Sequence, residues 1–197
     1  MEEQLFRACE RGKGDKVSGI LKTDETVDVN WKSGKRTVSY DVFGWVGESW
    51  TPLHAACVGD YLPTPSIFSL LLAHPDLDVN PKTTSGDTPF LWACRNGRTS
   101  CVQLLLKDAR VKVNEPDNDG NTPLRWAASK GHLDIIKWWI ASGREMDLGQ
   151  RGNENTNAIG EAKKEKNTEE VSLLERFKEN PEKTREQVRR ELGITGQ

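Results

Sequence analysis

The chain has 197 residues, of which 35% are hydrophobic and 29% charged, and its formal net charge is −2. Seven Trp and five Phe can build a core, which argues against a disordered chain, and the mild acidity argues against a general binder of nucleic acid or membrane surfaces. No apolar run approaches the roughly 20 residues that span a bilayer, and no signal core precedes the four Cys, so we expect reduced thiols in a cytoplasmic or nuclear protein.

The first predicted element is a pair of short helices within residues 2–30, followed by the extended stretch VDVN at 27–30. Residues 31–50 then form an insertion that carries the five aromatic residues Trp31, Tyr40, Phe43, Trp45 and Trp50. Residues 37–42 favour a strand, and the Ser-Gly pair at 33–34 turns that strand back as a hairpin. Some of these aromatic rings must pack on neighbouring helices or remain exposed, because a projecting hairpin cannot bury all of them.

Three later segments, 50–80, 81–114 and 115–148, repeat one pattern. Each contains Thr-Pro followed by a short apolar block, in TPLHAACVG, TPFLWACRNG and TPLRWAASKG. The Thr hydroxyl suits a helix N-cap and Pro suits the first helical position, while Gly97 and Gly131 suit the end of the helix. A second apolar helix follows each block. A spacing of 34 residues recurs from Thr88 to Thr122, from Asn80 to Asn114 and from Gly86 to Gly120.

The block at 51–56 reads T-P-L-H-A-A, which matches the ankyrin motif T-P-L-H-x-A, and the chain resembles the ankyrin-repeat family over about residues 3–177. The resemblance implies an all-α fold, an α-solenoid of about five helix-turn-helix units with β-turn or hairpin tips. The units are then about 2–30, 50–80, 81–114 and 115–148, with a degenerate cap at 149–178 and the hairpin insertion at 31–50. Together they form one repeat domain over residues 1–178.

The tail at 179–197 predicts one further helix. Asn180 suits its N-cap, Pro181 its first position and Gly193 its end. Only Val188 and Leu192 are apolar in its interior, so we expect this helix to pack lightly on the cap or to fray.

The residues that usually carry chemistry have structural interpretations here. Cys9, Cys57 and Cys94 occupy the same small-residue position of successive units, so we expect buried and inert thiols. No phosphate-binding loop, Cys-x-x-Cys pair or His pair at metal spacing occurs, so no catalytic residue, cofactor or metal is expected. The resemblance implies that His54 makes hydrogen bonds to the backbone or to Thr. Arg125 stands at the equivalent position two units later, which we expect to remove that link.

The resemblance also implies a non-enzymatic scaffold for protein–protein interaction, whose partner lies on a concave face made by the turn tips and first helices. Trp and Tyr of the insertion are the preferred contacts, because both are enriched in interface hot spots. The alternative is that the insertion aromatics plug the joint between the first two units. Trp92 and Trp126, one repeat apart, form either an aromatic ladder on this face or, as we favour, part of the framework. The predicted partner-binding residues are Tyr40, Trp45, Glu48, Trp50, Thr84, Ser85, Asp87, Arg95, Asn96, Asn118, Asp119, Asn121, Ser129 and Lys130.

Two other functions compete with this interpretation. Aromatic rings beside Lys32, Lys35, Arg36 and Arg95 would suit single-stranded nucleic acid, although the overall acidity disfavours it. The position of Asn30, Asn80 and Asn114 resembles the one that asparaginyl hydroxylases modify, so the chain is also a candidate substrate of such an enzyme. The expected partner remains another protein, with no role for a membrane, and we expect a monomer.

Overall fold

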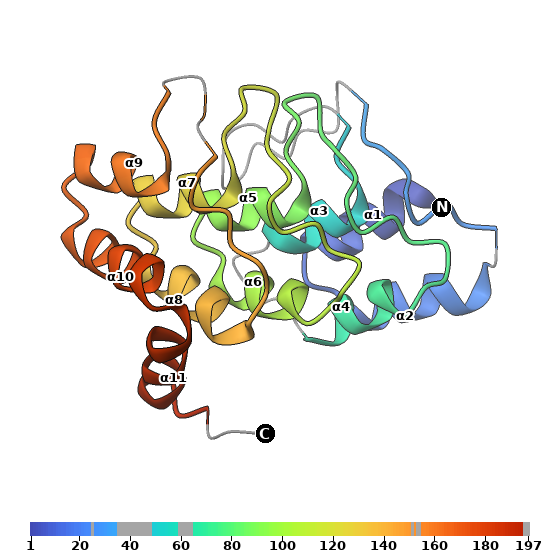
Figure 1. Ribbon diagram of the computed structural model, residues 1–197. Helices are drawn as coiled ribbons and strands as arrows, with labels where there is room; N and C mark the ends of the chain where they lie inside the picture. The colour runs from blue at the N-terminus through green and yellow to red at the C-terminus, as the bar shows by residue number, and fades with distance from the viewer. Residues whose placement is uncertain (25, 35–48, 59–64, 151, 153–154, 195–197) are drawn as a thin grey trace. The chain divides into compact units, whose positions relative to one another are not determined.

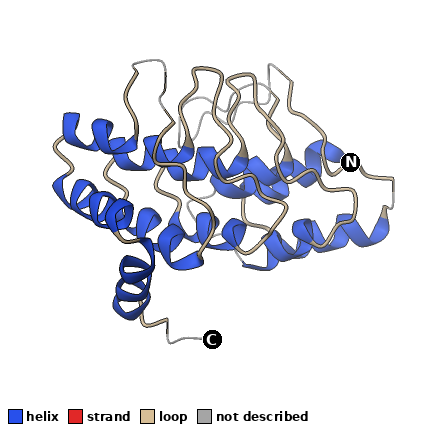
Figure 2. Cartoon of the chain, in the orientation of Figure 1, coloured by secondary structure: helices blue, strands red, loops and turns tan. Residues whose placement is uncertain are grey.

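The computed structural model of the protein describes residues 1–24, 26–34, 49–58, 65–150, 152 and 155–194. These residues form eleven helices and no strand. Figure 1 labels the helices, and Figure 2 colours them blue. The fold is therefore the all-α repeat fold that the sequence predicts, with five consecutive helix pairs and a final helix. The hairpin strand expected at 37–42 lies outside the described residues. The helices are α1 (Glu2–Glu10), α2 (Gly14–Thr23), α3 (Pro52–Val58), α4 (Pro65–Leu72), α5 (Pro89–Arg95), α6 (Thr99–Leu106), α7 (Pro123–Ser129), α8 (Leu133–Ser142), α9 (Ala158–Lys164), α10 (Thr168–Glu179) and α11 (Pro181–Glu191).

The chain divides into two compact units, residues 1–92 and 93–197. In the first unit α1 packs against α2 and α3, and α4 packs against α2 and α3. Phe6, Leu53 and Phe68 are completely buried in its core. The burial of these large apolar side chains supplies the main stabilisation of such short helices, which are marginal in water on their own.

The second unit is built in the same way. Its first helices α7 and α9 pack side by side, its second helices α6, α8 and α10 follow one another, and α7 also contacts α8. Leu124, Ile135, Trp139 and Leu174 are completely buried among them.

The start and end of the first helices follow the local chemistry that the sequence predicts. The Thr88 hydroxyl accepts a hydrogen bond from the Leu91 amide at 3.1 Å, and the Thr122 hydroxyl accepts one from the Arg125 amide at 3.2 Å. Gly97 ends its helix with φ +70°, and a Cβ there would lie 2.8 Å from Cε1 of His132. A side chain at this position would therefore be both strained and obstructed.

The insertion leaves and re-enters the first unit at one point. The Ser33 amide donates to the Trp50 carbonyl at 2.8 Å, and the Ser49 amide donates to the Ser33 carbonyl at 2.9 Å. The Trp50 amide donates in turn to the Ser33 hydroxyl at 3.0 Å. These bonds join the two ends of the insertion, and the helical repeat resumes directly after them at Thr51.

The final helix docks more closely than its few apolar residues predict. The Asn180 side chain caps α11 by accepting from the Lys183 amide, and Val188 is completely buried where α11 contacts α8 and α10 (Figure 1). Arg185 and Arg189 donate to the carbonyls of Ile140 and Ala141 at 3.3 and 2.8 Å. These carbonyls belong to the last turn of α8, where the Ile140 carbonyl also accepts from the Gly143 amide at 3.2 Å. The two guanidinium groups therefore add polar contacts to the apolar packing of Val188.

Candidate functional site

The predicted contact residues fall into three groups. Tyr40, Trp45 and Glu48 lie outside the described residues. Trp50, Asp87 and Asn121 are buried, with exposed fractions of 4%, 3% and 4%. The remaining eight are accessible: Thr84, Ser85, Asn96, Asn118, Asp119 and Lys130 are exposed, while Arg95 and Ser129 are half-buried.

Trp50 was expected to face outward, and that expectation is wrong. Its ring meets the edge of Trp92 at a centroid distance of 5.2 Å and an interplanar angle of 76°, and it lies 5.5 Å from the ring of His54. Burial of so large a ring is strongly favourable. Trp50, the last residue of the insertion, therefore packs between the second and third repeats of the first unit, and not at the joint between the first two repeats where a plug was the alternative. Trp92 is buried too, in agreement with its framework role.

His54 links two successive repeats of the first unit. Its Nδ1 accepts from the Thr51 amide at 3.3 Å and lies 3.0 Å from the Thr51 hydroxyl, and its Nε2 lies 3.0 Å from the Asp87 carbonyl. An amide can only donate, so Nδ1 is the acceptor and Nε2 carries the proton. The expected hydrogen bonds to Thr and backbone are confirmed. Burial lowers the pKa of His54 to about 4, although the Asp87 carbonyl opposes that shift.

We expect this histidine to make the free energy of unfolding depend on pH. The unfolded chain binds the proton with the ordinary pKa of 6.5, well above the folded value of about 4. The stabilisation that comes from the neutral, buried His54 is therefore complete above about pH 6.5. It is lost as the pH falls toward 4, by about 3 kcal/mol in total. Urea unfolding at a series of pH values measures the slope. His54→Leu, which copies Leu91 of the next repeat, should remove this component, and an unchanged slope would contradict the assignment.

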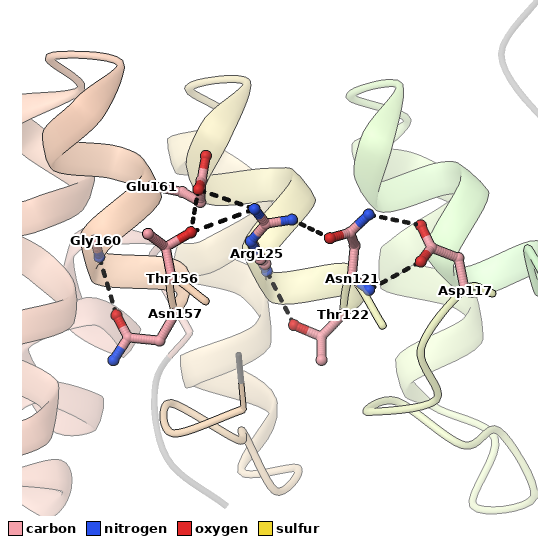
Figure 3. Close-up of polar contacts among 8 residues, drawn as sticks. All are labelled: Asp117, Asn121, Thr122, Arg125, Thr156, Asn157, Gly160 and Glu161. Atoms are coloured by element: carbon pink, nitrogen blue, oxygen red, sulfur yellow. Dashed lines mark hydrogen bonds and ion pairs between the residues drawn. The ribbon is translucent and has the colours of Figure 1, made fainter. Parts of the chain in front are cut away.

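Arg125 does not remove a link between repeats, contrary to the sequence-based expectation. Its guanidinium donates to Glu161 at 2.9 Å and to the Thr156 hydroxyl at 3.3 Å, and it also donates to the Asn121 side-chain oxygen (Figure 3). The exposed fractions of the Arg125 and Glu161 side chains are only 7% and 6%. Arg125 therefore replaces a neutral hydrogen bond with a buried ion pair, which joins α7 to α9.

Asn121, a predicted contact residue, belongs to the same network. Its amide donates to one oxygen of the Asp117 carboxylate at 2.8 Å, and its side chain donates to the other at 3.3 Å (Figure 3). Gly152 lies so close to Asn121 and Arg125 that a Cβ there would clash with the Asn121 side-chain oxygen and the Arg125 guanidinium. Asn121 is thus committed to contacts within the chain, and Asp117 closes the turn that precedes α7.

Trp126 is the accessible aromatic ring that sequence reasoning placed in the framework. It is half-buried, and its indole N–H donates to Asp117 at 2.9 Å. The guanidinium of Arg95 lies 5.5 Å from its ring centroid and the ammonium of Lys130 lies 5.9 Å from it. The structure therefore brings two predicted contact residues onto one aromatic ring. The sequence contained a signal for the contact between Lys130 and Trp126, because Lys130 follows Trp126 by one helical turn.

Other reactive side chains are held in inert environments. All four cysteines are free and buried, as predicted, and burial raises the pKa of Cys9 to about 12 and that of Cys94 well above its usual value. Such thiols carry almost no thiolate, the nucleophilic form. Within the described ranges no group of three or more His, Cys, Asp or Glu is arranged to hold a metal ion. None of the helices described is both long and apolar enough to cross a bilayer.

The asparagines of the extended stretches have structural contacts. The Asn30 side chain donates to the Asp76 carbonyl at 2.7 Å and accepts from the Asp78 amide at 2.8 Å. The Asn114 side chain accepts from the Asp147 amide at 3.1 Å. Each of these two residues therefore ties its own repeat to the following one.

Comparison with known proteins agrees with this architecture. A family profile described as ankyrin repeats in three copies matches residues 5–114 and 64–151. A comparison with curated proteins found no match. The two matched ranges together cover the residues from α1 to the loop after α8, including the Thr-Pro helix starts and the link made by His54. The chain belongs to the ankyrin-repeat family.

Proposed function

We propose that this protein is a non-enzymatic module that binds another protein through the surface around Trp126 in the second unit. Ankyrin repeats generally mediate protein–protein interactions. We define the Trp126 surface as the accessible residues on and beside the ends of α5 and α7 and on the turn that precedes α7. It comprises Arg95, Asn96, Asn118, Asp119, Trp126, Ser129 and Lys130.

The arrangement of Trp126 is the observation that carries this proposal. Its ring is fixed by the hydrogen bond to Asp117 and flanked by the cations of Arg95 and Lys130. The Arg95 backbone is held in turn, because its carbonyl lies 3.2 Å from Nε2 of His132. A ring and cations ordered before binding lose little entropy on association. Trp and Arg are also the residue types that most often dominate interface energetics.

The competing functions have weaker support. The net charge of −2 weighs against a polyanionic nucleic-acid ligand, and of the basic residues assigned to that ligand Lys35 and Arg36 lie outside the described residues. The Asn30 side chain makes two hydrogen bonds within the chain, which would have to break before that side chain could enter the active site of a hydroxylase. The buried, protonated thiols suit a reducing compartment such as the cytosol or nucleus. Thr84 and Ser85, on an exposed turn of the first unit, stay predictions.

We expect the Trp126 surface to fail in partner binding when its cations are removed. Arg95→Ala combined with Lys130→Ala should weaken binding of a captured and purified partner by at least about tenfold, since hot-spot truncations typically cost more than about 1 kcal/mol each. Biolayer interferometry with the purified pair provides the affinity, and thermal unfolding should change little because Lys130 is exposed.

The matched control is Lys107→Ala. Lys107 is an exposed lysine at the C-cap of α6, which is the second helix of its repeat. This variant should bind like the wild type. Equal affinity of the wild type and the double variant would place the partner elsewhere on the protein and contradict the proposal.

A further inference from the structure

An open groove of about 810 Å³ lies between α1 and α2 in the first unit. Ala8 and Ile20 contribute its apolar floor, and Gly19 lies beside them on α2. Leu5 and Phe6 of α1 are completely buried in the core. The groove-lining residues of both helices recur every three or four positions, so each helix contributes one continuous face.

The rim of the groove is basic. Four cations line it, Arg7, Arg11, Lys13 and Lys16, against the single carboxylate of Glu3. Arg7 is already paired with Glu10 at 3.1 Å and with Glu3 at 3.9 Å. In the part of the chain that the structure describes, no ion pair engages Arg11, Lys13 or Lys16. An apolar floor with three uncompensated cations at its rim complements an acidic, amphipathic ligand.

Gly19 is a second, independent feature of this groove. It lies inside α2, where glycine costs about 1 kcal/mol relative to alanine. A Cβ at this position would have nothing within 4 Å, and its φ does not lie in the left-handed region. Neither packing within the chain nor backbone strain therefore requires glycine here. What glycine provides is an uncovered stretch of helix backbone, which another backbone can approach closely.

We propose that the groove between α1 and α2 binds an acidic amphipathic helix of a partner protein. The apolar stripe of that helix lies on Ala8, Gly19 and Ile20, and its carboxylates face Arg11, Lys13 and Lys16. Helix-in-groove recognition uses apolar residues at i, i+3, i+4 and i+7 as anchors. The helices that form the groove are 9 and 10 residues long, or about 14 Å, which accommodates about two to three turns of the bound helix.

The test uses the full chain and three synthetic helical peptides of about 12 residues. They share one leucine–alanine stripe and differ only in carrying glutamate, glutamine or lysine beside it. Fluorescence anisotropy of the labelled peptides should show saturable binding of the glutamate peptide, at least about tenfold tighter than binding of the glutamine peptide. The lysine peptide should not bind, and added salt should weaken the glutamate complex.

Two variants locate the binding. Arg11→Glu combined with Lys16→Glu should weaken the glutamate peptide by at least about tenfold. Gly19→Leu should weaken it by about fivefold or more, since leucine fills the groove while favouring the helix. Lys22→Glu is the matched control, because Lys22 is an exposed lysine of α2 that does not line the groove, and it should stay within about twofold.

Several outcomes would overturn the proposal. They are the absence of saturable binding of the glutamate peptide, equal binding of the glutamine peptide, and indifference to both groove variants. Binding of a single-stranded oligonucleotide that depends on Arg11 and Lys16, without binding of the glutamate peptide, would also overturn it in favour of a nucleic-acid ligand. The Arg95 and Lys130 variants should leave peptide binding unchanged, so the groove and the Trp126 surface are tested separately.

Discussion

Replacing Arg125 with leucine is expected to lower the free energy of unfolding by about 3–5 kcal/mol, because the change leaves a buried carboxylate without its cation. Glu161 is at least as inaccessible as Arg125, so water cannot take over the lost contact without opening the α7–α9 interface. The same change removes the donors to Thr156 and Asn121. Urea unfolding of the full chain measures the loss, provided that the slope of the transition stays unchanged.

A double-mutant cycle separates this ion pair from simple loss of packing. Glu161→Leu alone should be destabilising to a similar degree, because it leaves the buried guanidinium unpaired. The double variant with leucine at both positions should recover most of the loss, since replacing a whole buried pair with apolar residues is often close to neutral. Additive losses in the double variant would show that the two side chains are not coupled.

An exposed pair provides the control for the Arg125 result. Arg110 binds Asp108 at 2.7 Å, but 45% of its side chain is exposed. Arg110→Leu should therefore cost less than about 1 kcal/mol. Hydrogen exchange should further show faster exchange in α9 and α10 for the Arg125 variant but not for the Arg110 variant, because Arg125 ties α9 to α7 through Glu161.

The contrast between His54 and Arg125 shows how far sequence can predict such links. The His54 contacts follow from a local motif, since Thr51 lies only three residues away and Asp87 closes the turn of the next repeat. The partner of Arg125 lies 36 positions later, in a unit whose repeat motif has decayed. Nothing in that unit marks Glu161 as a replacement acceptor. From sequence alone, the change from His to Arg therefore predicts the loss of the link between repeats, and only the three-dimensional arrangement of the helices shows the new partner.

The tryptophans also show that sequence does not predict features that depend on tertiary packing. Local chemistry predicted the Thr-Pro helix starts and the Asn180 cap, because these depend on neighbouring residues. Trp50 and Trp126 differ in whether later parts of the chain cover them, which depends on tertiary packing. Trp is frequent both in cores and in interface hot spots. Residue type alone therefore misplaced Trp50, which is buried, and left open whether the half-buried Trp126 is a framework or a binding residue.

Trp50→Ala should lower the free energy of unfolding by about 3–5 kcal/mol, the usual cost of removing a buried Trp ring. The ring packs against both Trp92 and His54, so its loss leaves a cavity in the first unit. Trp50→Phe should lower the free energy of unfolding clearly less, because an aromatic ring still fills most of the space. Urea unfolding of the three proteins gives the comparison, and an alanine variant as stable as the wild type would restore an outward position for Trp50.

The pH dependence of the same variant provides a second readout. Without the Trp50 ring, water reaches His54, and the pKa of the histidine should rise from about 4 toward its ordinary value of 6.5. The stability lost between about pH 6.5 and about pH 4 should then be smaller in Trp50→Ala than in the wild type. A cavity that stayed dry would lower stability at all pH values and leave the slope unchanged. The slope therefore distinguishes a Trp50 ring that shields His54 from one that only fills space.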